Sequence, residues 1–307
     1  RAPAITPHAT PRRAFVTLLS ETSYLPGVIA LHSSLTASES AYPLVVIVTA
    51  AVPPAVRGRL EALARCEVRE VAPPDLPAGA AHYACAHFAH CWTKLRMWEW
   101  EDEFSRLCYL DADMLLLKNC DELLGDRLCG GAALHAVPEC SCVSGRSGGC
   151  PYLSPPAGAP PAHYFNAGLL VLSPCRATAE AMRAALAASD LASFAFAEQD
   201  FLNRYFAHDR GAAGAGPPCS WRALPWCFNA TKGLYARHRG LCRLGEVRIL
   251  HFTMAKPWDL RHPCHAGFER LNALWHAAFA DPASLPRATL RAVLQEKRER
   301  ESQGGGV

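Results

Sequence analysis

The sequence predicts an α/β protein built on a mostly parallel β-sheet with helices on both faces. Three observations support this fold class. Half of the 307 residues are hydrophobic, so the chain can bury a full core. Apolar, β-branched runs alternate with segments of helical periodicity, a pattern typical of parallel sheets. Two carboxylates, Asp111 and Asp113, directly follow one apolar run, and ligands bind beyond such strand ends.

The first third of the chain predicts strands with helices between them. Residues 13–20 (RAFVTLLS) have the composition of a buried strand, and residues 24–35 carry apolar side chains at helical spacing. Residues 42–50 form a second β-branched run. A helical stretch containing Leu60 then precedes a third predicted strand, CEVREV. This alternation predicts parallel strands that are covered by helices on both sides.

The segment before the paired aspartates predicts a helix and then a strand. Residues 91–100 (CWTKLRMWEW) suit an amphipathic helix, and the strand that follows ends at Asp111. Side chains at positions i and i+2 of a strand point the same way. Asp111 and Asp113 are therefore expected to converge on one ligand.

The second half of the chain begins with an insertion and then returns to regular elements. Residues 140–161 are rich in Gly, Ser and Pro, which indicates a surface insertion. After Pro286, we expect one charged helix and a disordered end, SQGGGV. Between these segments we expect a strand at YFNAGLLVLSP, an Ala-rich helix near 177–188, a helix that starts at EQDFLNRYF, and a last strand at VRILHFT.

The charge and composition exclude some classes of protein. The 31 basic and 28 acidic residues leave a net charge of only +3 without a long block of like charge, so no nucleic-acid partner is expected. No apolar run reaches the roughly 20 residues of a membrane span. The first residue is Arg, which suggests a fragment or processed product. The 14 scattered cysteines do not settle whether the thiols are reduced or oxidised. The compartment, cytoplasm or Golgi lumen, stays open, as does a homodimer.

The paired aspartates suggest a cation site. Two convergent carboxylates repel each other, so they favour a shared proton or a cation between them, and a divalent ion also attracts phosphate oxygens. For an isolated Asp-x-Asp pair, helix capping or a turn is the more common role. The motifs around Asp111 and Asp113 decide between these interpretations.

Several motifs, taken together and in order, resemble the family 8 glycosyltransferases, the group that contains glycogenin and galactinol synthase. The resemblance runs from about Ala14 to Trp258. It implies a GT-A-like single domain with a Rossmann-like sheet at residues 12–280, followed by a C-terminal helix and disordered tail at 281–307. The motifs are AFVTLLSETSYLPGVIALHSSL, WTKLRMW, LDAD with NCDELL, FNAGLLVLSP, EQDFLN, LPWCFNA and ILHFTMAKPW.

The resemblance implies a metal centre that binds a diphosphate. In this family, the Asp-x-Asp pair and a distant His hold a manganese ion on the diphosphate of a UDP-sugar. The matching residues are Asp111, Asp113 and His251, and two hard oxygens with one imidazole suit Mn²⁺ or another divalent cation. Lys256 would supply positive charge to the diphosphate as a catalytic residue, and Lys94 resembles a lysine near the nucleotide-sugar.

Other matching positions imply contacts to the nucleoside. Leu18, Ser20 and Tyr24 resemble positions around the uracil and ribose, and the ring of Tyr24 could cover the base. Core packing is the alternative role for Leu18. Ala112, between the two aspartates, belongs to the same implied substrate-binding set.

The sugar-binding positions depart from the glycogenin pattern. By motif position, Asn166 would bind the sugar, and Glu198 and Gln199 would act in catalysis. Glu198 stands where glycogenin has Asp, and Asp200 replaces a Gly, so the sugar and the acceptor stay open. Glu139 resembles a further acidic position near the sugar.

The acceptor side is less clearly marked. Asn229 begins an NAT glycosylation sequon, but LPWCFNA also resembles an acceptor-side loop of the family, and we favour a substrate-binding role. Tyr235 is the nearest candidate for a self-glucosylated tyrosine like that of glycogenin.

Together these features imply a metal-dependent retaining transfer of a hexose from a UDP-sugar to a hydroxyl of a carbohydrate, polyol, glycolipid or protein. Two alternatives stay open. One is a catalytically silent nucleotide-sugar-binding protein, against which the retained metal ligands argue. The other is a haloacid-dehalogenase-type phosphatase with Asp111 as nucleophile. That fold should open near the aspartates, whereas roughly a hundred residues of sheet pattern precede them.

Two groups of cysteines and histidines have other candidate roles. The spacing within residues 82–91 fits no standard zinc site, so structural or incidental roles are expected for His82, Cys85, His87, His90 and Cys91. In the insertion, a disulfide could form among Cys140, Cys142 and Cys150 if the chain is lumenal.

Overall fold

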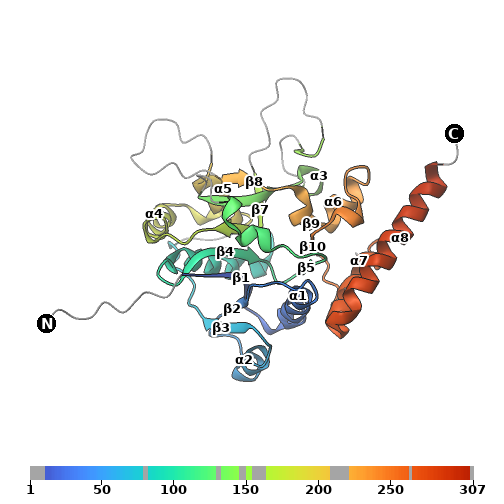
Figure 1. The fold of residues 1–307 in the computed structure, drawn as a ribbon. Helices are drawn as coiled ribbons and strands as arrows, with labels where there is room; N and C mark the ends of the chain where they lie inside the picture. Colours follow the sequence, from blue (N-terminus) through green and yellow to red (C-terminus); the bar gives the residue numbers. More distant parts are fainter. Residues whose placement is uncertain are drawn as a thin grey trace.

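The computed structural model has a seven-stranded central sheet as its core (Figure 1). The strand order is β3-β2-β1-β4-β7-β6-β8. In that order the strands are Cys66–Glu70, Leu44–Val48, Arg12–Leu19, Phe104–Leu110, Phe165–Leu172, Leu134–Pro138 and Trp221–Ala223. The structure describes residues 11–78, 82–128, 133–144, 150–153, 164–207, 221–262 and 265–304.

Strand β7 is the antiparallel member of an otherwise parallel sheet. It pairs antiparallel with β4 and β6, whereas β1, β2, β3 and β4 form a continuous parallel half and β8 is parallel to β6. The predicted mostly parallel α/β sheet is confirmed. The reversal of β7 was not predicted. Its apolar run is buried on both faces, and such a run does not indicate whether the strand is parallel or antiparallel to its neighbours.

The sheet has a hydrophobic core on each face. Along β1, Ala14, Val16 and Leu18 contribute to one cluster, and Phe15 and Leu19 contribute to the other, as the period of two in a strand requires. The first cluster is covered by the 3₁₀-helix η2 (Ala86–Glu99) and by helices α4 (Arg176–Ala187) and α5 (Glu198–Tyr205). The second is covered by α1 (Leu25–Ala37) and α2 (Pro54–Glu61).

Helix η2 contains the segment expected to be an amphipathic helix. Its winding is 3₁₀ and it begins at Ala86, before the predicted start. Trp92, Leu95 and Trp98 are all buried and stand three residues apart. In a 3₁₀-helix residues i and i+3 lie directly above one another, so this spacing lines up the three side chains toward the first cluster.

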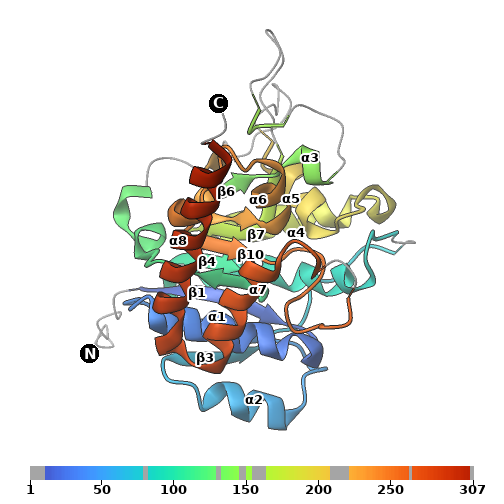
Figure 2. The ribbon, with the colours of Figure 1, turned by 90° about the vertical axis from the view of Figure 1, so that its right-hand side faces the viewer.

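A second, three-stranded sheet of order β5-β10-β9 lies beside the first. Its strands are Met114–Leu116, Ile249–His251 and Ala230–Thr231. A third hydrophobic cluster joins it to helices α7 (Glu269–Ala280) and α8 (Leu285–Gly304), which pack together on one side of the molecule (Figure 2). The last predicted strand, VRILHFT, therefore corresponds to β10 and belongs to this small sheet.

The remaining helical elements of the described residues are short. They are the helices α3 (Ser141–Ser144) and α6 (Lys232–Arg237), and the 3₁₀ turns η1 (Thr22–Tyr24), η3 (Asp121–Leu124), η4 (Asp126–Leu128), η5 (Leu191–Ser193), η6 (Trp226–Phe228), η7 (Leu244–Glu246) and η9 (Pro282–Ser284). Among the described helices, none has the length and apolar character needed to cross a bilayer.

Helix α8 corrects the expectation of a disordered end. Residues 302–304 of the SQGGGV segment belong to α8, and residues 305–307 lie outside the described range. Good helix formers and side-chain pairs stabilise α8 as far as Glu301: Gln295 donates to Glu299, and Lys297 lies 3.9 Å from Glu301. The predicted insertion, 140–161, is described only at α3 and at residues 140 and 150–153.

Helix α1 packs very closely on the turn that carries the aspartates. A Cβ atom built on Gly27 would lie 2.4 Å from the carbonyl oxygen of Ala112 and 2.8 Å from the Trp258 ring. Only a hydrogen atom fits there, so glycine allows α1 to contact the backbone between Asp111 and Asp113.

This close contact predicts opposite effects for two identical substitutions. Gly27→Ala should lower the free energy of unfolding by about 1–3 kcal/mol, because the new methyl group must displace backbone. Gly58→Ala, at an exposed position of α2 with no neighbouring atom within 4 Å, should raise it by about 0.5–1 kcal/mol. Urea unfolding followed by circular dichroism measures both. Equal shifts in one direction would contradict the packing described.

Candidate active site

The turn at residues 111–113 joins the two sheets. Strand β4 of the large sheet ends at Leu110, and β5 of the small sheet begins at Met114. The backbone N–H of Asp111 donates to the carbonyl of Gly168 on β7 at 2.8 Å, and the carbonyl of Asp113 accepts from Phe252 at 2.9 Å. The backbone of Asp111 is therefore fixed by β7, and that of Asp113 by the residue that directly follows β10.

The pairing of β5 with β10 brings a histidine to this turn. In the antiparallel register His251 stands opposite Met114, the residue after Asp113. The Nε2 atom of His251 lies 3.2 Å from Oδ1 of Asp113 and 3.9 Å from Oδ2 of Asp111. One donor atom from each of the three side chains lies within 4.8 Å of the others.

These three side chains fit a divalent cation. Two carboxylate oxygens and one imidazole nitrogen suit a Mn²⁺-like ion. The space between them depends on Gly168, since a Cβ atom there would lie 2.6 Å from Cε1 of His251 and 2.9 Å from Oδ2 of Asp111. The Asp111 side chain is 31% exposed, against 6% for Asp113 and 4% for His251, so a ligand would reach the group from the side of Asp111.

Lys256 places a positive charge at the same centre. Its ammonium group donates to Oδ2 of Asp113 and to the carbonyl of Phe252 at 3.2 Å. Burial opposes ionisation of Asp113, but Lys256 and His251 together hold its pKa below the usual range. Lys256 also lies 5.7 Å from the centroid of the Tyr24 ring.

Lys94 is a second cation, and it is fully buried. Its Nζ lies 2.7 Å from Oε1 of Glu198 and 3.4 Å from Oδ1 of Asp111. Tyr109 completes this group by donating its hydroxyl to Oδ1 of Asp111 at 2.8 Å. Burial disfavours the charged form of Lys94, but Asp111 and Glu198 raise its pKa well above the usual value.

A chain of polar side chains extends from His251. The Nδ1 atom of His251 lies 2.8 Å from Oδ1 of Asn229, an arrangement in which the ring donates its proton and Nε2 could act as the ligand of a cation. Asn229 donates in turn to Oδ1 of Asn166 at 2.8 Å, and Asn166 donates to Oε2 of Glu139 at 2.6 Å. The buried amide of Asn229 thus supports the histidine, a role that its sequence context did not indicate.

Gln199 and Asp200 stabilise the strand and loop beside the site. Gln199 accepts from the backbone N–H of Ala167 at 2.8 Å and donates to the Tyr164 hydroxyl at 3.1 Å. Asp200 accepts from Tyr164 and from the backbone N–H of Phe196. Ala197, just before Glu198, has a φ of 46°, a conformation that a non-glycine residue adopts only when its surroundings enforce it.

The remaining nucleoside candidates lie near the turn or in the core. The Tyr24 ring packs edge-on against Trp258 with centroids 5.7 Å apart. The carbonyl of Ser20 accepts from Thr49, whereas Leu18 and Ala112 are buried in hydrophobic clusters.

The other sequence-based candidates have partners of their own. The Tyr235 hydroxyl donates to Glu296 of α8. His87 packs against Tyr24 with ring centroids 6.0 Å apart, and His90 lies 3.3 Å from Glu21. Cys140 and Cys150 have their sulfur atoms 3.8 Å apart, about twice the length of a disulfide bond, so the disulfide considered for the insertion is not formed between them.

Comparison with known sequences identifies close relatives. Residues 15–261 match glycosyl transferase family 8. Galactinol synthase 4 of Arabidopsis thaliana is 33% identical over 81% of this chain and 75% of its own length. Galactinol synthase 1 of Ajuga reptans is 32% identical over 80% of this chain and 74% of its own length.

Solved glycosyltransferase structures share the fold. Galactosyltransferase LgtC, crystallised with donor and acceptor sugar analogs, aligns with a TM-score of 0.54 and 17% identity, covering 87% of this chain and 95% of its own. Glycosyltransferase GlyE of Streptococcus pneumoniae TIGR4 aligns with a TM-score of 0.58 and 16% identity over 90% of this chain and 63% of its own. The fold is thus GT-A-like, and the sequence match shows that this chain belongs to glycosyltransferase family 8.

Proposed function

We propose that the chain is a metal-dependent, retaining glycosyltransferase that moves a hexose from a UDP-sugar to a hydroxyl group. The observation that carries this proposal is the convergence of Asp111, Asp113 and His251 where the two sheets meet, in a chain of family 8. Mn²⁺ or another divalent ion held by these residues would offset the charge of the departing diphosphate.

Residues of the chain itself would bind and orient the donor. Lys256 already holds its ammonium group at Asp113, where it can interact with a diphosphate oxygen. The Tyr24 ring, which lies near both Lys256 and Trp258, offers an aromatic surface for the uracil. On the sugar side, Asn166 and Glu198 supply polar groups close to the aspartates, and Lys94 holds Glu198 in place.

The relatives suggest a donor and an acceptor. Two chains named galactinol synthase match across most of this sequence, so we propose UDP-galactose as donor and a polyol as acceptor. Glu198 and Asp200 differ from the glycogenin pattern at the sugar-binding helix, which is consistent with a reaction other than glycogen priming.

The metal ligands predict the effect of one isosteric change. Asp113→Asn should lower metal-dependent UDP-sugar hydrolysis at least about 100-fold, because the amide keeps the shape of the side chain but loses the charge that binds the cation. Asp102→Asn, whose parent side chain is 79% exposed and pairs with Arg176, is the matched control and should keep its activity. The proposal would be refuted if both variants hydrolysed UDP-sugars at equal rates. It would also be refuted if the parent protein bound UDP but turned over no UDP-sugar donor.

Asn229 should affect metal affinity more than turnover. Without its carbonyl oxygen, the His251 ring loses the group that fixes its orientation, and such losses typically cost about 10–100-fold in metal affinity. Asn229→Ala should therefore need about 10–100-fold more Mn²⁺ for half-maximal activity, with activity largely restored at saturating metal. A Mn²⁺ titration of the initial rate measures this. An unchanged Mn²⁺ requirement would show that Asn229 does not support the ligand.

Donor preference can be measured without knowing the acceptor. Hydrolysis of UDP-galactose should exceed that of UDP-glucose, UDP-xylose and UDP-glucuronate, and a polyol should accelerate the consumption of UDP-galactose. Release of UDP reports the rate, and NMR of the product shows whether the anomeric configuration is retained. Faster use of another donor would overturn the galactosyl assignment and leave the metal-dependent transfer intact.

A further inference from the structure

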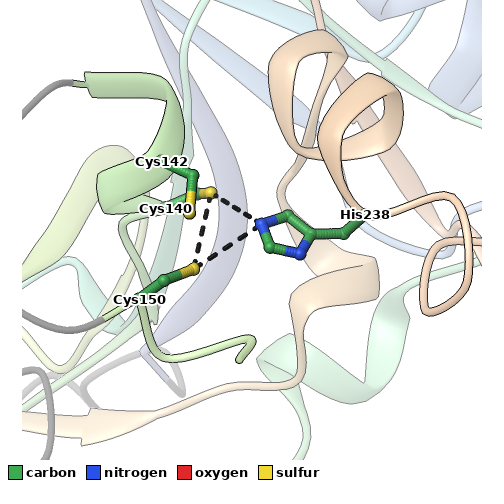
Figure 3. Close-up of side chains that lie close together, drawn as sticks. All are labelled: Cys140, Cys142, Cys150 and His238. Carbon is green, nitrogen blue, oxygen red and sulfur yellow. Dashed lines mark hydrogen bonds between the residues drawn. The ribbon is translucent and has the colours of Figure 1, made fainter. Parts of the chain in front are cut away.

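A second group of metal-binding side chains lies apart from the aspartates. It consists of Cys140, Cys142, Cys150 and His238 (Figure 3). Cys140 follows β6 closely, Cys142 lies in α3, and Cys150 comes from the middle of the same insertion. His238 directly follows α6. One donor atom from each of the four lies within 4.8 Å of the others.

The distances among Cys140, Cys150 and His238 match three edges of a zinc tetrahedron. With Zn–S near 2.3 Å and Zn–N near 2.0–2.1 Å, tetrahedral ligands stand about 3.8 Å apart for S···S and about 3.5 Å apart for S···N. The sulfur atoms of Cys140 and Cys150 are 3.8 Å apart. Nε2 of His238 lies 3.3 Å from the first sulfur and 3.6 Å from the second.

The surroundings suit a closed, structural site. Cys140, Cys150 and His238 are buried, whereas Cys142 is exposed. Buried thiols often act simply as small apolar groups, as Cys242 does in the same cluster. Apolar packing alone gives no reason for three sulfur atoms to gather around one imidazole nitrogen, whereas three thiolates and one imidazole are a common ligand set of structural zinc.

We propose that Cys140, Cys142, Cys150 and His238 bind a structural zinc ion. Four protein ligands leave no open position for a substrate, so the ion would cross-link the chain and take no part in catalysis. It would tie the insertion that follows β6 to the end of α6. The sequence does not reveal this set, because His238 is far from the cysteines and no standard spacing links them.

This cross-link would join the segments that contain two members of the polar chain in the candidate active site, Glu139 and Asn229. Cys140 directly follows Glu139, which accepts from Asn166. His238 ends the short segment that begins at Asn229 and contains α6. A zinc ion would therefore hold together the two segments that position Asn166 and Asn229.

Zinc content in variants of the full chain tests the proposal. Protein purified with added zinc and without chelators should contain about one zinc per chain by elemental analysis. Cys142→Ser and His238→Gln should lose it, whereas His238→Cys, which supplies a fourth thiolate, should keep it. Cys242→Ser is the control for a buried cysteine of the same cluster. Asp113→Asn should also retain the zinc, which separates this site from the aspartate centre.

Cobalt substitution provides an independent test of the proposed zinc site. Protein loaded with Co²⁺ should show the visible bands of a tetrahedral site and a thiolate-to-cobalt charge-transfer band, in the parent and in Asp113→Asn but not in Cys142→Ser. Because Cys142 is exposed, its serine variant should remain folded by circular dichroism. The proposal would be overturned if the parent protein contained no zinc, or if Cys142→Ser and Cys242→Ser contained equal amounts of zinc. A Cys140–Cys150 disulfide in protein purified under reductant would also overturn it.

Discussion

The antiparallel pairing of β5 with β10 is the interaction on which the candidate active site depends. Only three residue pairs form this ladder, yet they bring His251 to Asp113 from a distant part of the sequence. A slip of one residue would turn the imidazole to the opposite face of the strand. The register is held by burial: Leu115 and Leu250 belong to the third hydrophobic cluster, which α7 and α8 complete.

Buried charges keep the centre in one arrangement. Lys94 and Lys256 each pair with carboxylates in places where an unpaired charge would be costly. Such pairs contribute little net stability, but they fix the orientation of the acids before a ligand arrives. The strained backbone at Ala197 fits this view, because it sets the start of α5 where Glu198 meets Lys94.

Long apolar elements could be predicted from the sequence, and short ones could not. Strands β1, β2, β4 and β7 carry continuous apolar runs, whereas β5 and β9 have three and two residues and leave no periodic signal. The family resemblance placed Asp111, Asp113 and His251 together, and the structure does so too. The support of His251 by Asn229 was missed because it depends on three-dimensional pairing that no local pattern encodes. The roles of these residues stay predictions.

Gly168 shows that the space among Asp111, Asp113 and His251 leaves no room for even a small side chain on the neighbouring strand. The nearest atoms to a Cβ at this position would be Cε1 of His251, Oδ1 of Asn166 and Oδ2 of Asp111, all within 2.9 Å. Replacement of Gly168 by alanine, which adds one methyl group, would therefore crowd the centre while leaving all three proposed ligands in the sequence. A relative that keeps both acids and the imidazole could still be an inactive descendant, and the residue at this glycine position would show it.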